Sequence, residues 1–217
     1  MRGSGGGVLR QLDGLVFDLD GTLWDTNGVC AEVWNDVVRE LGIHTNTWVT
    51  EADVRAVAGL PHHACVRAVF KDLPEPAVHT IAEVTARRDN EAVSQFGGRL
   101  YDGVPEVLCA LAQRMRVFIV SNCQSGYIEI FLRQAELERV VCDVECWGNT
   151  GLSKADNLRA LIARNGLDKT AYVGDTEGDR AAAVSVGVPF VFADYGFGKA
   201  SAWDARIASL AELLEIV

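Results

Sequence analysis

Lysine is scarce in this sequence, and nowhere do basic residues form a run. The 217 residues carry a formal net charge of −10 at pH 7, and lysine occurs only at positions 71, 154, 169 and 199. Proteins that bind nucleic acid through its phosphates need clustered Lys and Arg. We therefore expect no nucleic-acid partner. An acidic protein that binds phosphate must obtain positive charge locally, from a metal ion or from a few well-placed cations.

Long apolar runs are also missing. No apolar stretch reaches the roughly 18 residues of a membrane-spanning helix, so we expect no membrane contact. Residues 1–7, MRGSGGG, lack the apolar region of a signal peptide and are predicted to form a flexible tail. The six cysteines show neither paired nor zinc-type spacing, which predicts reduced thiols and a cytoplasmic location.

Hydrophobic periodicity divides the chain into two kinds of segment. After the first strand the apolar residues recur at helical spacing as far as residue 98, with Gly and Pro breaks that predict four helices. Further along, helices alternate with short apolar strands, ending in a helix over residues 204–215, and this alternation is typical of parallel βαβ units. We predict a doubly wound parallel α/β sheet, in which residues 1–24 and 99–217 form a core domain and residues 25–98 an inserted four-helix domain.

The stretch from Gly14 to Asp25, GLVFDLDGTLWD, carries the first candidate chemistry. A short apolar run, of the kind expected for a buried strand, ends in Asp18 and Asp20. Two carboxylates placed this close repel each other unless a cation or a proton lies between them. The spacing therefore favours a metal site or an acid/base pair, with a solvated acidic turn as the alternative.

Polar residues follow a second predicted strand and open a later helix. Ser121 and Asn122 come between the strand over residues 117–120 and a helix, where a hydroxyl, an amide and backbone N–H groups suit phosphate oxygens. A simple helix cap is the alternative. Lys154 falls in the first turn of a helix, the unfavourable end for a cation. We expect an anion beside it, unless the lysine is merely exposed.

The segment Gly174 to Asp179, GDTEGD, also joins a strand to a helix. Helix capping accounts for part of its acidity, but not for Asp175 at the strand end together with Asp179. Carboxylates on neighbouring strand ends suit Mg²⁺. Because ligands of open α/β sheets bind beyond the carboxyl ends of the strands, we expect Asp175 to lie near Asp18.

Together these residues resemble the four motifs of the haloacid dehalogenase (HAD) superfamily, most of whose members are phosphatases. The matching residues, in order, are Asp18-Leu-Asp-Gly-Thr-Leu23, Ser121, Lys154 and Gly174-Asp-x-x-x-Asp179. The resemblance implies that Asp18 is the nucleophile that takes the phosphoryl group and that Asp20 is the general acid/base. The inserted helices resemble the helical cap of phosphoglycolate phosphatases and β-phosphoglucomutases.

The resemblance further implies a Mg²⁺-dependent phosphomonoester hydrolase that acts on a small phosphorylated metabolite through an aspartyl-phosphate. We expect a monomer or a homodimer, a choice that the sequence leaves open. A sugar-phosphate mutase of the same fold and a non-enzymatic phospho-acceptor switch are the alternatives. The implied phosphate-binding residues are Thr22, Ser121, Asn122 and Lys154, and the implied metal ligands are Asp18, Asp20, Asp175 and Asp179, with Asp20 acting through its backbone carbonyl.

The clearest break between the inserted helices is Gly59-Leu60-Pro61-His62-His63. Related helical-cap enzymes carry a substrate-specificity loop at this place. The resemblance implies that Gly59, His62 and His63 face the active site and that His62 contacts the substrate. The alternative is that His62 merely opens the third helix of the insertion.

Overall fold

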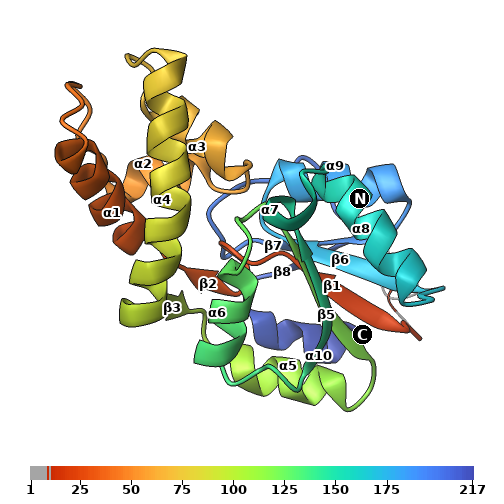
Figure 1. The fold of residues 1–217 in the computed structure, drawn as a ribbon. Coiled ribbons are helices and arrows are strands. Elements are labelled where there is room, and N and C mark those ends of the chain that lie inside the picture. Colours follow the sequence, from red (N-terminus) through yellow and green to blue (C-terminus); the bar gives the residue numbers. More distant parts are fainter. Residues whose placement is uncertain (1–8, 10) are drawn as a thin grey trace.

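The computed structural model describes residue 9 and residues 11–217, and shows a sheet flanked by helices beside a separate group of four helices (Figure 1). The tail expected over residues 1–7 lies outside the described residues. Within the described part of the chain, no helix is both long and apolar enough to cross a membrane.

The sheet has six strands in the order β5-β4-β1-β6-β7-β8, and every neighbouring pair is parallel. The strands are β1 (Gly14–Phe17), β4 (Arg116–Ser121), β5 (Val141–Cys146), β6 (Thr170–Gly174), β7 (Phe190–Ala193) and β8 (Ala205–Ile207). Because β1 lies between β4 and β6, the chain winds outward from it in both directions. The carboxyl end of β1 is therefore the place where sheets of this kind bind their ligands.

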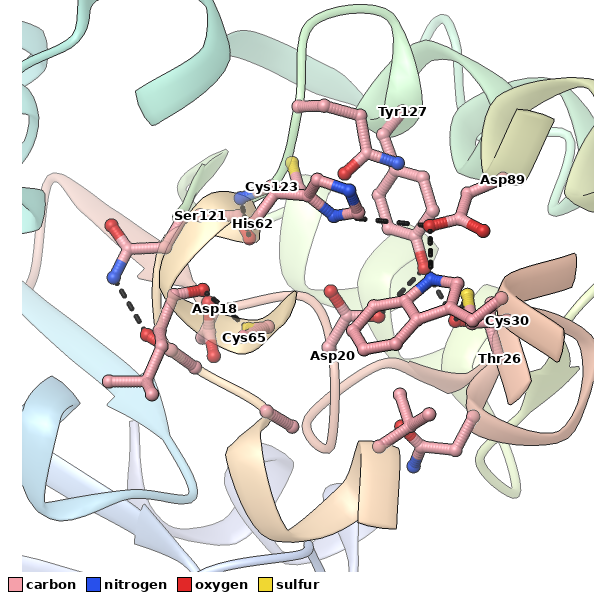
Figure 2. A pocket seen from close by; sticks show the side chains of 18 residues that line it. Asp18, Asp20, Thr26, Cys30, His62, Cys65, Asp89, Ser121, Cys123 and Tyr127 are labelled. Carbon is pink, nitrogen blue, oxygen red and sulfur yellow. Dashed lines mark hydrogen bonds and ion pairs between the residues drawn. The ribbon is translucent and has the colours of Figure 1, made fainter. Parts of the chain in front are cut away.

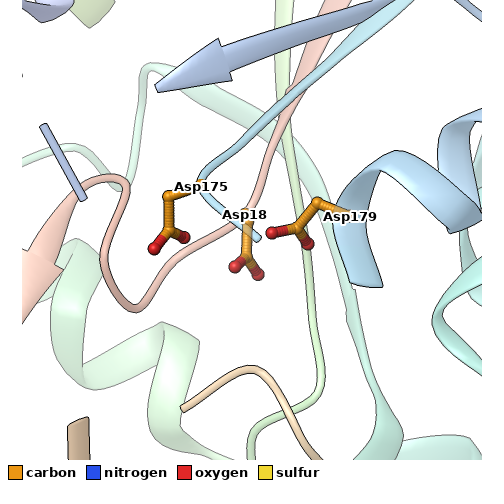
Figure 3. Close-up of side chains that lie close together, drawn as sticks. All are labelled: Asp18, Asp175 and Asp179. Carbon is orange, nitrogen blue, oxygen red and sulfur yellow. The ribbon is translucent and has the colours of Figure 1, made fainter. Parts of the chain in front are cut away.

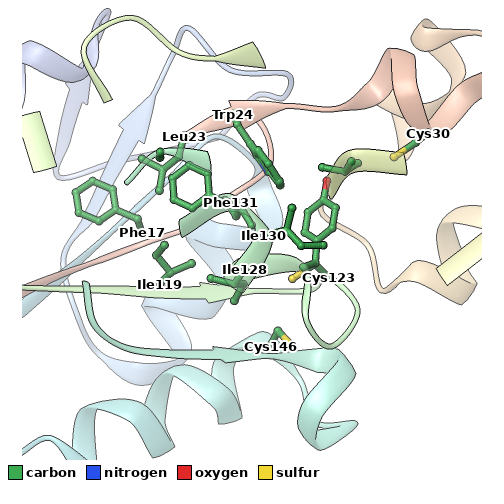
Figure 4. Packing of buried hydrophobic residues seen from close by; sticks show 14 of the residues in the cluster. Phe17, Leu23, Trp24, Cys30, Ile119, Cys123, Ile128, Ile130, Phe131 and Cys146 are labelled. Atoms are coloured by element: carbon green, nitrogen blue, oxygen red, sulfur yellow. The ribbon is translucent and has the colours of Figure 1, made fainter. Parts of the chain in front are cut away.

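Helices cover both faces of the sheet, which explains why the central strands β1, β4, β6 and β7 are buried and mostly apolar. The helices outside the insertion are α5 (Val104–Ala112), α6 (Tyr127–Gln134), α7 (Trp147–Thr150), α8 (Lys154–Arg164), α9 (Glu177–Val186) and α10 (Leu213–Ile216). On one face Phe17 and Ile119 pack with Phe131 of α6 (Figure 4). On the other face Val16 packs with Leu158 of α8.

Four helices form the insertion: α1 (Asn27–Glu40), α2 (Glu51–Val57), α3 (His62–Val69) and α4 (Glu75–Phe96). Each begins close to its predicted position; α2, for example, opens with a capping box made by Thr50 and Asp53. The prediction of a parallel α/β sheet with a four-helix insertion is thus confirmed. The division into domains at residues 24/25 and 98/99 stays a prediction.

A two-stranded antiparallel ladder joins the insertion to the sheet. It consists of β2 (Trp24–Asp25) and β3 (Arg99–Leu100). Asp25 accepts hydrogen bonds from Arg99 at 2.9 Å and from Arg55 of α2 at 3.1 Å. Trp24 packs edge-on against Tyr127 and Phe131 of α6, with ring centroids 5.0 and 5.2 Å apart. Both ends of the insertion are therefore held against the edge of the core.

The helix predicted over residues 204–215 is wrong. Residues Ala205–Ile207 form β8 and extend the sheet beside β7, followed by a 3₁₀ turn over Leu210–Glu212 and the short α10. Ile207, Leu210 and Leu213 are buried, and their spacing of three suits a helix as well as it suits this path. Pairing with the edge of β7 satisfies the backbone of both strands, which local periodicity does not reveal.

Candidate active site

The first turn after β1 holds Asp18 and Asp20 beneath the insertion. The backbone N–H of Asp18 donates to the Val173 carbonyl at 2.8 Å, which fixes Asp18 beside the end of β6. Gly21 has φ +83°, and a Cβ at this position would lie 2.4 Å from a carboxylate oxygen of Asp175. Only glycine allows so close an approach. The turn is consequently packed directly onto the second acidic segment.

Three buried carboxylates meet at this edge of the sheet (Figure 3). Asp18, Asp175 and Asp179 each offer an oxygen atom such that all three atoms lie within 4.8 Å of one another. They come from the end of β1, the end of β6 and the first turn of α9. Their proximity matches the expectation from the sequence, and so many buried anions need compensating charge.

Lys154 supplies part of that charge. Its Nζ donates to Asp18 Oδ1 at 2.8 Å and to Asp179 Oδ1 at 2.6 Å, and the side chain is buried. The anion expected beside Lys154 is therefore present, and the exposed alternative does not apply. Burial alone would lower the pKa of Lys154, but its ion pairs with Asp179 and Asp18 raise that pKa well above its usual value. The ammonium group stays charged.

One ammonium group cannot neutralise three carboxylates. Burial, with Asp179 close by, raises the pKa of Asp175 to about 7. Mg²⁺ prefers a few carboxylate oxygens of this kind and keeps several waters, so the donor set fits the ion. Both oxygens of Asp179 already accept hydrogen bonds, one from Lys154 and the other from the N–H and hydroxyl of Thr176. Asp179 therefore suits a supporting position better than a direct metal contact.

Asp20 points into a cavity and is held by an aromatic hydroxyl. Tyr127 Oη donates to Asp20 Oδ1 at 3.0 Å and lies 2.5 Å from the hydroxyl of Thr26. Burial raises the pKa of Asp20 to about 6, and the bond from Tyr127 opposes that rise. A carboxyl group with such a pKa can give and take a proton near neutral pH.

The remaining predicted phosphate ligands divide into two groups. Ser121 and Asn122 line the cavity, where Ser121 Oγ also accepts from the Cys123 N–H at 3.3 Å. The Asn122 side chain donates to the Gly59 carbonyl at 2.7 Å and so ties the insertion to the end of β4. Thr22 instead donates to Asp175 Oδ1 at 3.2 Å, a contact that orients this carboxylate.

The cavity lies between the sheet edge and the insertion and has a volume of about 70 Å³ (Figure 2). Asp18, Asp20, Gly59 and His62 are among the residues that line it. His63 is outside the lining and lies 3.2 Å from Glu75. The structure thus brings Gly59 and His62 to the site and places His63 on another face of α3.

Several residues that line this cavity are not predicted from the sequence, and Tyr127 and Asp89 are two of them. Tyr127 has no motif that would identify it. Asp89, in contrast, belongs to the buried stripe of α4, where it follows Thr85 and precedes Val93 at intervals of four residues. A carboxylate inside a helical stripe that is otherwise buried and largely apolar is a signal that the sequence does carry.

The chain resembles known proteins over most of its length. The family model of haloacid dehalogenase-like hydrolases matches residues 15–193. A protein of Xanthomonas campestris named phosphoglycolate phosphatase is 30% identical over 189 residues, which cover 84% of this chain and 83% of that protein. The tyrosine-protein kinase PtkA of Mycobacterium tuberculosis is 28% identical over 206 residues, covering 92% of this chain and 67% of that protein.

Among solved structures, a predicted phosphoglycolate phosphatase from Haemophilus somnus has a similar fold. Its TM-score is 0.82 at 22% identity, over 96% of this chain and 99% of that one. The family match begins in β1 and ends with β7, so it includes each strand that positions a residue of the site.

Proposed function

The chain belongs to the family of haloacid dehalogenase-like hydrolases, and on this premise we propose that it is a Mg²⁺-dependent phosphatase of a small phosphate ester. The observation that carries the proposal is the position of Asp18 at the centre of the sheet edge. It pairs with Lys154, lies beside Asp175 and faces the same cavity as Asp20.

In the first step, Asp18 Oδ2 attacks the phosphorus atom of the ester. Among the described residues none donates a hydrogen bond to this oxygen, whereas Oδ1 is held by Lys154. The new bond between Asp18 and phosphorus forms as the bond from phosphorus to the ester oxygen breaks, and Asp20 gives its proton to that oxygen. The products are an alcohol and a phosphorylated Asp18.

In the second step, water attacks the phosphorus atom, and the bond from phosphorus to Asp18 Oδ2 breaks, which restores the Asp18 carboxylate. Asp20, now a carboxylate, accepts the proton of the attacking water, and inorganic phosphate leaves. The bond from Tyr127 keeps Asp20 oriented toward the cavity in both steps. Ser121 and Asn122, which line the cavity, and Lys154, which holds Asp18, are proposed to bind the phosphoryl oxygens, with Thr22 acting through Asp175.

Asp18, Asp175 and the backbone carbonyl of Asp20 would hold the magnesium ion, supported by Asp179. When bound, Mg²⁺ neutralises the acidic cluster and the charge of the phosphoryl group. Gly59 and His62 are proposed to contact the leaving group. His63 does not line the cavity, so any effect of His63 on substrate choice is proposed to act through the adjacent His62.

The test is release of inorganic phosphate from p-nitrophenyl phosphate and a panel of metabolite phosphates, with and without Mg²⁺. Asp18→Asn should abolish release, by at least about a thousandfold, while the exposed Asp102→Asn serves as the charge-matched control. Wild-type activity in folded Asp18→Asn would refute the mechanism. Transfer of the phosphoryl group to another molecule without phosphate release would favour a mutase or a kinase, and stable phosphorylation without turnover a switch.

A further inference from the structure

A loop that follows β7 encloses the carboxylate of Asp175. The backbone N–H groups of Phe197 and Gly198 donate to Asp175 Oδ2 at 2.8 and 3.2 Å. A Cβ added at Gly196 would lie 2.3 Å from the Cβ of Asp175, so the backbone of the loop comes closer to Asp175 than a side chain would allow. The direction in which the Asp175 carboxylate points therefore depends on the position of this loop, residues 195–198.

Arg55 of α2 joins the insertion to this loop. Its guanidinium carbon lies 5.3 Å from the centroid of the Phe197 ring, within the range of a cation–π contact. The same guanidinium group donates to Asp25 Oδ2 in the β2–β3 ladder at 3.1 Å and to Glu51 Oε1 of its own helix at 2.7 Å. If α2 moved away from the core, the contact with the loop that holds Asp175 would be lost.

The ion pair with Asp25 does not by itself explain an arginine at position 55. Asp25 also accepts from Arg99 at 2.9 Å and, through Oδ1, from the backbone N–H of Asn27 at 3.0 Å. The Arg55 side chain is 41% exposed, and the ion pair of such an exposed group contributes little to stability. A planar guanidinium group can pair with a carboxylate and also lie over a ring. Within the described residues, Arg55 is the one cation that lies over Phe197.

We propose that Arg55 is a positioning residue for the metal site. By holding Phe197, it fixes the loop whose N–H groups orient Asp175, and so strengthens the binding of Mg²⁺. The proposal rests on the metal-dependent function proposed above and adds a residue of the insertion to it. The coupling must be reciprocal, because two events that favour the same conformation strengthen each other equally. Metal binding should therefore hold α2 against the core before any substrate enters.

The charge of Arg55 alone predicts the opposite effect on the metal. One residue, Phe197, connects Arg55 to Asp175 through its ring and its backbone N–H. Removing a cation from the neighbourhood of a metal site lowers the repulsion that the bound ion meets. Loss of the charge by itself would therefore leave Mg²⁺ binding unchanged or make it tighter, whereas loss of the contact that positions the loop would make it weaker. The sign of the change separates the two roles.

Binding of Mn²⁺ to the intact protein without substrate, followed by electron paramagnetic resonance of the free ion, tests the proposal. Mn²⁺ takes the same carboxylate, carbonyl and water ligands as Mg²⁺. Arg55→Gln and Phe197→Leu should each raise the Kd at least about threefold. Arg99→Gln is the matched control, because it removes the other ion pair of Asp25 without touching Phe197, and it should change the Kd by less than about twofold. Circular dichroism checks that each variant is folded.

Combining Arg55→Gln with Phe197→Leu measures whether the two residues act through one contact. The double variant should raise the Kd by clearly less than the product of the two single changes, since the contact can be lost only once. An effect equal to that product would overturn the proposal, because Phe197 would then act through another neighbour, such as the Tyr101 ring 6.5 Å away. In the wild type, Mg²⁺ should also slow hydrogen exchange of the α2 amides, and Arg55→Gln should reduce this protection.

Wild-type or tighter Mn²⁺ binding by folded Arg55→Gln or Phe197→Leu would overturn the proposal. An equal loss in Arg99→Gln would overturn it as well, since the effect would then belong to the charge at Asp25. Exchange of the α2 amides that does not respond to Mg²⁺ would refute the reciprocal coupling. Phosphate release distinguishes failure of the phosphatase function. If the wild type binds Mn²⁺ as expected but releases no phosphate, only that function fails; if the wild type binds no divalent ion, the metal site and the coupling fail together.

Discussion

Replacing Asp89 with Asn is expected to stabilise the folded protein at neutral pH. Burial raises the pKa of Asp89 to about 8, while the hydrogen bond from Trp34 opposes the rise. In the unfolded chain the same carboxyl group titrates near its ordinary value of 3.8. The folded state therefore binds an extra proton between these two values, and the free energy of unfolding falls as the pH rises through that window.

The size of the effect follows from the width of the window. The free energy of unfolding falls by about 1.4 kcal/mol per pH unit inside this window, so at pH 7 the ionisation of Asp89 costs at most about 4 kcal/mol of stability. Because water in the cavity solvates the charge, we expect a cost between about 1 and 4 kcal/mol. The groups facing Asp89 are Asp20, Cys30, His62, Cys65 and Tyr127. They are present in both proteins, so the difference between wild type and Asp89→Asn reports mainly on Asp89.

The assay is urea unfolding followed by circular dichroism between pH 4.5 and 8. The stability gain of Asp89→Asn should be small at pH 4.5 and should grow toward pH 8. The control Glu91→Gln, a change at an exposed position of the same helix α4, should stay within about 0.5 kcal/mol of wild type throughout. A gain that does not change with pH, or a variant less stable than wild type at pH 7, would show that the carboxyl group is well satisfied in the fold.

Three further predictions concern the reaction. Asp20→Asn should slow hydrolysis of an alkyl phosphate by about a hundredfold or more, and unchanged turnover would remove Asp20 from the mechanism. Asp175→Ala should raise the Mg²⁺ concentration needed for half-maximal activity at least about tenfold, and wild-type activity should disappear with EDTA; full activity after exhaustive chelation would exclude the metal. Tyr127→Phe should lower kcat about three- to tenfold with little change in KM, because it loses the bond that orients Asp20 together with the contact to the Thr26 hydroxyl; a change confined to KM would assign Tyr127 to substrate binding instead.

The sequence was sufficient where chemistry demands one residue type at one strand end. Asp18 and Asp175 directly follow the ends of apolar strands, and Lys154 is the first residue of a helix. A parallel sheet brings such positions together at one edge. The four helices of the insertion could also be predicted from the sequence, because the breaks between them contain Gly and Pro. These features depend on local patterns, which a single sequence records.

Other features depend on which distant surfaces meet. Tyr127 reaches Asp20 only because α6 packs against Trp24, a contact that spans about half of the chain. His62 and His63 are neighbours in sequence, yet the rotation of α3 turns one into the cavity and the other toward Glu75. The strand β8 forms because the edge of β7 is open to it. Tertiary packing decides all three cases, and local propensity does not predict any of them.

The ladder of β2 and β3 makes the four-helix insertion exchangeable. Since Trp24 pairs with Leu100 and Asp25 with Arg99, the chain leaves the sheet region and returns to it about one strand spacing apart, roughly 5 Å. A short turn could close that gap, and a longer or differently shaped segment could occupy it at little entropic cost. Recombination at the β2–β3 ladder could replace the residues that contact the leaving group without moving those that react with phosphorus. Substrate range and catalytic chemistry can thus evolve independently within one polypeptide.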